Sequence, residues 1–295
     1  MAVVTNPDEP VGRKSVVTPP PVKVLAIKHD ISVLQPHKFD SAFTAGISDL
    51  KPDLFVVAAY GKIIPKEIIE MPKYGALNIH PSLLPRWRGA SPVQYSILNG
   101  DTETGVTVML MDEKMDHGPI VTNSKFEIRN SKLTTPELSE ILSKMGMELI
   151  IETIPKWING KIKPIPQDET KATYSKILKK EDGRINWSKP AASIERQVRA
   201  LAPWPGSFTY WKRGEKMVQL KVLEADLRDT EKSDFPLEVG LQQVDGTVIV
   251  KNNRLFVKTG SEYLEILKIQ PEGKREMTAK EFINGYGDID GAILQ

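Results

Sequence analysis

The stretch that decides the fold runs from Asp53 to Tyr60 and reads DLFVVAAY. It is a continuous apolar run bounded by Pro52 and Gly61, a pattern typical of a parallel strand buried on both faces. Pro65 can occupy the first turn of a short helix, and ALNIH at 76–80 then predicts a second buried strand. The order strand, helix, strand indicates an α/β fold built on a mostly parallel sheet.

Further elements extend this first domain to residue 160. We expect a helix over 90–98 and strands over 105–111 and 120–128. A long helix then begins at Thr134 or Thr135, because the capping box favours one threonine as the cap and the proline rule the other. Its apolar residues recur at helical spacing until Gly160. The first domain is therefore expected at residues 1–160.

The rest of the chain predicts a linker over 161–206 and a second domain over 207–295. The beginning of the linker mixes Lys, Pro, Gln, Asp and Thr with little periodicity, as in a segment that lies over the surface. Short strand-like runs follow, separated by turn residues, at 207–211, 217–223, 246–250, 255–259 and 263–269. This pattern predicts a small, OB-like β-barrel.

Composition excludes several classes of protein. The 295 residues contain no cysteine, so neither a disulfide framework nor a thiolate metal site is possible. No two of the four histidines have the spacing of helical metal ligands, and we expect no metal. The apolar runs are shorter than the roughly 20 residues that span a bilayer, and the N-terminus does not have the order of a secretory signal. We therefore expect a cytoplasmic protein that does not enter membranes.

The segment 78–90, NIHPSLLPRWRGA, delivers polar groups at the end of a predicted buried strand. Ligands of open α/β sheets bind at the carboxyl ends of strands. Asn78 and His80 share a face of the strand, so an amide and an imidazole can approach one carbonyl together. A second polar strand end, at 112–119, can bring a carboxylate to the same crevice. Asp112 and Asp116 are the two candidates there.

These motifs carry a resemblance. NIHPSLLPRWRGASP followed by TGVTVMLMDEKMDHGPI is similar, in order and spacing, to the signature of the 10-formyltetrahydrofolate-dependent formyltransferases. Downstream, ATYSKILKKEDGRINWSKPA at 172–191 and RALAPWPGSF at 199–208 resemble the linker of the methionyl-tRNA formyltransferases, a branch of this family. The resemblance covers nearly the whole chain. It implies a doubly wound, Rossmann-like catalytic domain and a C-terminal tRNA-binding β-barrel over 207–295.

The resemblance also implies roles for individual residues. Asn78, His80 and Asp116 would form the catalytic set, with Asp116 preferred to Asp112 by the family's spacing. A formyl group would pass from 10-formyltetrahydrofolate to the α-amino group of methionine on initiator tRNA, at a site without metal. Asn78 and His80 would stabilise the oxyanion, and Asp116 would orient His80 and act as general base. The residues implied to bind folate are Ser82, Leu83, Leu84, Pro85, Tyr60 and Gly61.

Contacts to tRNA are expected from basic residues. Arg13 matches the basic position of the loop with which the family grips the acceptor end, and Lys14 adjoins it. Arg86 and Arg88 flank Trp87 and could hold the tRNA end or the glutamate tail of the folate, or could be solvated loop charges. On the β domain, Lys212 and Arg213 could contact phosphates, although for any single lysine a solvated surface position is the better expectation.

One part of the family pattern differs. The family opens with a strand, a glycine-containing loop and a helix before the segment that matches Val3 to Thr5, and these are absent here. Either the true start lies upstream or the product is inactive. We expect an incomplete sheet, a monomer prone to association, and weak activity. The rival functions are formyl transfer to a small amine, hydrolysis of the formyl donor, or an inactive remnant that binds tRNA or folate.

Overall fold

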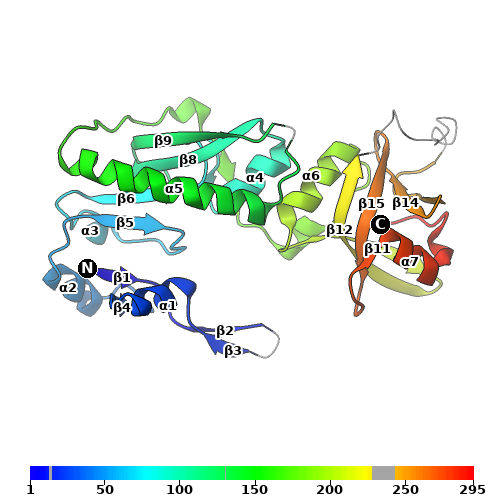
Figure 1. The fold of residues 1–295 in the computed structure, drawn as a ribbon, viewed down its shortest axis with the longest axis horizontal. Helices are drawn as coiled ribbons and strands as arrows, with labels where there is room; N and C mark the ends of the chain where they lie inside the picture. Colours follow the sequence, from blue (N-terminus) through cyan, green and yellow to red (C-terminus); the bar gives the residue numbers. More distant parts are fainter. Residues whose placement is uncertain (13–14, 130, 228–242) are drawn as a thin grey trace. The chain divides into compact units, whose positions relative to one another are not determined.

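The apolar run at 53–60 forms strand β5 (Phe55–Ala58), which pairs in parallel with β6 (Ala76–His80) in the computed structural model of the chain (Figure 1). The structure describes residues 1–12, 15–129, 131–227 and 243–295. Two units can be distinguished. The first comprises residues 1–90, 105–125 and 144–173, and the second comprises 91–104, 126–143 and 174–295. Three elements, β8 (Glu103–Leu110), β9 (Ile120–Glu127) and α5 (Thr135–Ile158), therefore contribute residues to both units.

The first unit contains a four-stranded sheet in the order β5-β6-β8-β9. Strand β8 (Glu103–Leu110) runs antiparallel to β6 and sets His80 opposite Thr107, and β9 (Ile120–Glu127) forms the far edge. Helix α5 (Thr135–Ile158) supplies Ile150 to the apolar core of this unit. Its start is capped by the Glu137 carboxylate, which accepts hydrogen bonds from the N–H and the hydroxyl of Thr134. The Glu137 side chain therefore makes its half of the predicted capping box at Thr134.

The N-terminal elements of this unit form small, separate sheets. Strand β1 (Ala2–Val4) pairs in parallel with β4 (Ser32–Leu34), and β2 (Glu9–Val11) pairs with β3 (Val16–Thr18). The helices of this part of the chain are α1 (Pro21–Lys28), α2 (Ser41–Asp49) and α3 (Lys66–Ile69). Among the described strands, β5 pairs only with β6 and β1 only with β4. As expected of an incomplete sheet, β5 is an edge strand. The prediction that this strand is buried on both faces is wrong, because its residues alternate between half-buried and exposed.

The second unit contains an antiparallel sheet in the order β11-β12-β15-β14-β13, with β16 paired to β15. The C-terminal residues join its two edges, because Leu294 bridges to Trp211 and Ile293 bridges to Thr247. This arrangement confirms the predicted small β-barrel. Its elements are β11 (Ser207–Arg213), β12 (Lys216–Leu227), β13 (Val248–Lys251), β14 (Arg254–Lys258), β15 (Tyr263–Pro271), β16 (Met277–Thr278), α7 (Ala279–Gly285) and η4 (Gly287–Ile289).

The expected linker at 161–206 contains more structure than its sequence suggested. Its second half forms α6 (Ala191–Leu201), which buries Ala191, Ile194 and Val198 in the core of the second unit. Burial of one apolar face stabilises such a helix. The remaining short elements are β7 (Arg88–Gly89), α4 (Pro92–Asn99), η1 (Glu169–Lys171), β10 (Tyr174–Ser175) and η2 (Lys180–Gly183). Part of the predicted linker therefore belongs to the core of the β unit.

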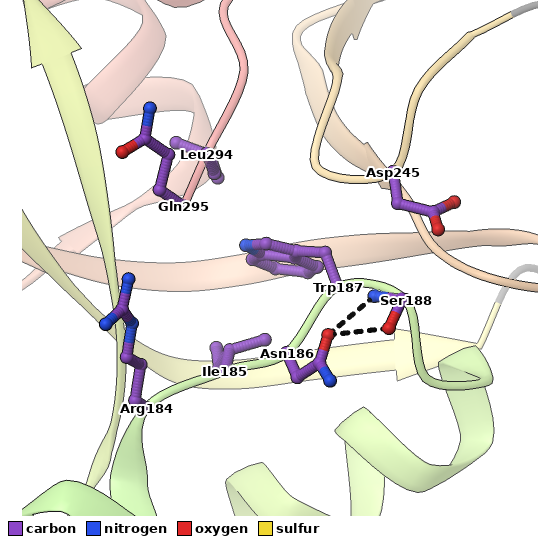
Figure 2. A pocket seen from close by; sticks show the side chains of 8 residues that line it. All are labelled: Arg184, Ile185, Asn186, Trp187, Ser188, Asp245, Leu294 and Gln295. Carbon is purple, nitrogen blue, oxygen red and sulfur yellow. Dashed lines mark hydrogen bonds between the residues drawn. The ribbon is translucent and has the colours of Figure 1, made fainter.

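The second unit also has an open hollow of about 450 Å³ beside its C-terminal residues (Figure 2). Trp187 lines it with a buried ring whose Nε1–H donates to the hydroxyl of Thr209. Asn186 accepts from both the N–H and the hydroxyl of Ser188, as Figure 2 shows. These hydrogen bonds join neighbouring residues of the segment that leads to α6. The hollow is thus a feature of how this segment packs against the barrel.

Candidate active site

The end of β6 carries the predicted amide and imidazole. Asn78 and His80 are two residues apart on this strand, so they lie on the same face of the sheet. His80 is buried, with 4% of its surface exposed, whereas Asn78 is half-buried. The strand places both groups before the turn that begins at Pro81. The predicted pairing of the two groups at one strand end is therefore present.

Both ring nitrogens of His80 have a neighbour. Nε2 lies 3.0 Å from the carbonyl oxygen of Trp87, and because a carbonyl can only accept, Nε2 carries the proton. Nδ1 lies 3.5 Å from Oδ1 of Asp116. Burial lowers the pKa of His80 below its ordinary value, and this effect exceeds the opposing influences of the Asp116 carboxylate and the Trp87 carbonyl. A neutral ring with a free lone pair on Nδ1 therefore faces the carboxylate.

Asp116 is held in an unusual backbone conformation. Its φ is +50°, in the left-handed region, where a residue other than glycine costs on the order of 1 to 3 kcal/mol. Its Oδ2 accepts a hydrogen bond of 2.8 Å from the N–H of Gly89. The competing carboxylate, Asp112, is bonded to His117 at 2.6 Å instead. Of the two acidic residues, the structure brings Asp116 to His80.

The predicted folate-contacting loop is fixed by a residue that the sequence did not single out. The hydroxyl of Thr107, in the middle of β8, donates to the carbonyl of Ser82 and accepts from the N–H of Leu84. Ser82 in turn donates through its hydroxyl to the carbonyl of Arg86 at 2.6 Å. Thr107 is fully buried. A hydroxyl inside the apolar run GVTVMLM was the signal that could have revealed it.

Tyr60, one of the residues predicted to bind folate, presents a buried hydroxyl. Neither this hydroxyl nor Oδ1 of Asn6 has a hydrogen-bond partner among the described residues. The Asn6 amide nitrogen reaches the carbonyl of Tyr60 at 3.4 Å, which places the two residues side by side. Burial raises the pKa of Tyr60, so its hydroxyl stays protonated and can donate. Gly61 follows with a φ of +76°, a conformation that suits glycine.

The predicted tRNA-binding residues have different surroundings. The Arg86 guanidinium lies 4.5 Å from the centre of the Trp87 ring, a cation–π contact. Lys212 is exposed, and Arg213 pairs with Asp288, whose carboxylate raises the pKa of this guanidinium. Arg13 and Lys14 lie outside the described residues.

Arg88 requires a correction. Only 1% of its surface is exposed, and its guanidinium is bonded to Glu169 and to Gln167. A tRNA phosphate can contact only side chains at the protein surface. The prediction that Arg88 binds tRNA is therefore wrong, because its guanidinium is buried. The Arg88 side chain therefore has an internal role.

In the described part of the chain, no group of three or more histidine, aspartate or glutamate side chains is arranged to hold a metal ion. Within the same residues, no helix is both long enough and apolar enough to cross a membrane.

Comparison with known proteins gives the family. The formyl transferase model matches residues 1–154, and the model of the formyl transferase C-terminal domain matches 177–287. The methionyl-tRNA formyltransferase of Chloroflexus aurantiacus is 41% identical over 288 residues, which cover 97% of this chain and 88% of the relative. The enzyme of the same name from Enterococcus faecalis is 43% identical over 289 residues, with the same two coverages.

Solved structures share the fold. WlaRD, a sugar 3N-formyl transferase crystallised in the presence of dTDP and 5-N-formyl-THF, superposes with a TM-score of 0.63 at 20% identity. The alignment covers 93% of this chain and 88% of WlaRD. From the two domain matches, the close relatives and the geometry at the end of β6, we conclude that this chain belongs to the formyl transferase family.

Proposed function

We propose that this enzyme transfers a formyl group from 10-formyltetrahydrofolate to the α-amino group of methionine on initiator tRNA. The names of the relatives that match nearly the whole chain support this substrate. The observation that carries the proposal is the buried, neutral imidazole of His80 between the Trp87 carbonyl and the Asp116 carboxylate. An acyl transfer to an amine needs a proton acceptor of this kind beside an oxyanion donor.

The proposed chemistry uses the three residues together. The amine attacks the formyl carbon, and the carbonyl oxygen becomes an oxyanion that accepts a hydrogen bond from the Asn78 amide. The resemblance implied that His80 donates to the oxyanion and that Asp116 is the base, but Nε2–H of His80 is already bonded to the Trp87 carbonyl. In our proposal the amine proton instead passes, directly or through a water, to the Nδ1 lone pair of His80. Asp116 then stabilises the imidazolium, whose positive charge also favours the oxyanion. When the tetrahedral intermediate collapses, the bond between the formyl carbon and the folate nitrogen breaks, and that nitrogen takes up the proton held by the His80 imidazolium.

The folate is proposed to bind beside Ser82, Leu83, Leu84, Pro85, Tyr60 and Gly61. The partnerless hydroxyl of Tyr60 and the partnerless Oδ1 of Asn6 fit a polar heterocycle, because a buried polar atom without a partner costs about 1 to 3 kcal/mol until a ligand satisfies it. One group can donate and the other can accept. A pterin ring offers complementary atoms of both kinds.

The tRNA is proposed to contact basic side chains, namely Arg13, Lys14, Arg86, Lys212 and Arg213. The β-barrel at 207–295 would supply the last two, as a tRNA-binding domain in a cytoplasmic enzyme. Attraction between exposed cations and the phosphate backbone releases counterions and falls with salt. Arg86 differs from the others, because its place over Trp87 suits a planar guanidinium that can contact the acceptor end.

The test is formylation of charged initiator tRNA with 10-formyltetrahydrofolate, compared with a small amine as the acceptor. We expect His80→Ala to lower kcat by at least about a hundredfold while folate binding changes little, as for a loss of transition-state stabilisation. The control is His29→Ala, because His29 is exposed at the end of α1. Near-normal turnover of His80→Ala, or transfer to the small amine alone, would contradict the proposal.

A further inference from the structure

The loop that carries Asp116 is held from its backbone by one side chain. Nε2 of Gln167 donates to the carbonyl oxygens of Asp116 and Gly118, both at 2.8 Å. The two protons of this amide nitrogen are therefore both used on the loop. Gln167 comes from the segment before η1, far along the chain from Asp116. The Gln167 side chain thus binds a turn in which Asp116 has a positive φ.

The orientation of the Gln167 amide is fixed from its other side. Its Oε1 accepts from Nε and Nη2 of Arg88, at 3.0 and 2.8 Å. A flipped amide would set its oxygen against two carbonyl oxygens and its nitrogen against a guanidinium, so only one orientation satisfies these four contacts. Arg88 thus determines which way the Gln167 amide points.

Arg88 is itself held in place. Its guanidinium forms a two-pronged ion pair with Glu169, at 2.9 and 2.6 Å, and this contact lowers the pKa of the Glu169 carboxyl. Its backbone N–H donates to the carbonyl of Thr173. Because the guanidinium is buried, its positive charge needs such a partner. The conformation of Arg88 is therefore set by contacts on both its side chain and its backbone.

These contacts close a ring around Asp116. The N–H of Gly89 bonds to the Asp116 carboxylate, while the side chain of the preceding Arg88 acts through Gln167 on the Asp116 carbonyl. Residues 88–89 thereby hold the side-chain carboxylate of Asp116 directly and its backbone carbonyl through Gln167. A carboxylate only 3.5 Å from Nδ1 of His80 depends on such support, because a shift of about 1 Å would weaken the pair.

We propose that Arg88 and Gln167 are positioning residues, which hold the Asp116 carboxylate beside His80 during proton transfer. This assignment rests on the proposed function of the His80 and Asp116 pair. It gives a role to a buried arginine and to a glutamine from the predicted linker, neither of which touches the reacting atoms. A glutamine that served only to stabilise the loop would affect folding and leave the titration of His80 unchanged.

The test replaces Gln167 by methionine, which has a similar length and no hydrogen-bonding amide. We expect kcat to fall by about tenfold or more, with the KM for 10-formyltetrahydrofolate and for charged tRNA within about threefold of the wild type. The acid limb of the pH–rate profile should move to lower pH, since a displaced Asp116 no longer raises the pKa of His80. NMR of ring-labelled histidine should show the same direction of change for His80 without any substrate.

The matched control is Gln197→Met. Gln197 is buried, whereas Gln167 is half-buried, and the Gln197 amide nitrogen likewise donates to two carbonyls, those of Gly183 and Arg184 in the second unit. Its loss should lower the melting temperature without moving the titration of His80. If Gln167→Met behaves in the same way as this control, the proposal is overturned. If Gln167→Met does not fold, Arg88→Lys decides, because it keeps the charge beside Glu169 and loses the fork that orients Gln167.

The NMR titration separates the two proposals. A downward shift of the His80 pKa in a protein that formylates no acceptor would leave the positioning role standing while the proposed function fails. Suppose instead that the wild-type enzyme formylates tRNA and that the pKa of His80 is unchanged in Gln167→Met and Arg88→Lys. The proposed function would then stand, and the positioning role would fail.

Discussion

Nδ1 of His80 lies 3.5 Å from Oδ1 of Asp116, although the two residues come from different strand ends of the sheet. The carboxylate favours the charged imidazole, and burial favours the neutral one. Burial has the larger effect, so the ring is a base that is free to accept a proton at neutral pH. Several measurements can check what this arrangement implies.

The pH dependence of the reaction should follow His80. Because its pKa in the folded protein is lowered from 6.5, kcat/KM should rise with pH along an acid limb whose midpoint lies below 6.5. Asp116→Asn removes an interaction that raises this pKa, so it should move the midpoint to still lower pH and reduce the maximum rate. A midpoint above 6.5 in the wild type, or an upward shift in Asp116→Asn, would contradict the role given to burial.

Gly118 should tolerate no side chain. A Cβ at this position would lie 1.8 Å from the carbonyl oxygen of Leu110, so the loop that carries Asp116 would have to move. We expect Gly118→Ala to lower kcat by about tenfold or more and to reduce the free energy of unfolding by about 1 to 3 kcal/mol. The control is Gly46→Ala in α2, where an added Cβ meets no atom within 4 Å and where alanine favours the helix. Equal effects of the two substitutions would refute the steric argument.

Exposed Lys212 should contribute to the salt dependence of tRNA binding. If its ammonium contacts a phosphate, Lys212→Ala should weaken binding and reduce the slope of log K against log salt by about 1. Exposed Lys73, which lies over the ring of Tyr74, provides the comparison, and its replacement by alanine should leave the slope unchanged. Filter binding over a series of salt concentrations measures both. An unchanged slope in Lys212→Ala would remove this residue from the interface.

The edge of β5 should promote self-association. Val56 on this strand is 46% exposed, and β5 pairs only with β6 among the described strands. Unpaired edges with apolar side chains can pair with another chain, and a lysine opposes this. Sedimentation velocity should therefore show association that rises with protein concentration and that Val56→Lys reduces. Val244→Lys is the control, because Val244 is 59% exposed but lies outside the strands. Equal effects would indicate general hydrophobic attraction instead of edge pairing.

Some contacts had a signal in the sequence that was not used. Ala191, Ile194, Val198 and Leu201 recur at helical spacing, and α6 buries all four. Thr107 interrupts an apolar strand with a hydroxyl, which a buried position must satisfy. Gln167, by contrast, lies in a polar segment, where a further polar side chain gives no signal of a specific role. Its place over the Asp116 loop could not be predicted from neighbouring residues.

The sequence alone predicted the strands around 53–60 and 76–80 and the second β domain, because hydrophobic runs and short-range spacing encode local structure. The set of Asn78, His80 and Asp116 was implied by the resemblance of its motifs to a known family. Only the tertiary structure decided that Arg88 is buried and that its guanidinium bonds to Gln167. The physical reason is that the sequence around an arginine does not show whether its guanidinium is solvated by water or paired with a carboxylate. That outcome depends on which distant loop folds over it, and here the loop brings Glu169 and Gln167.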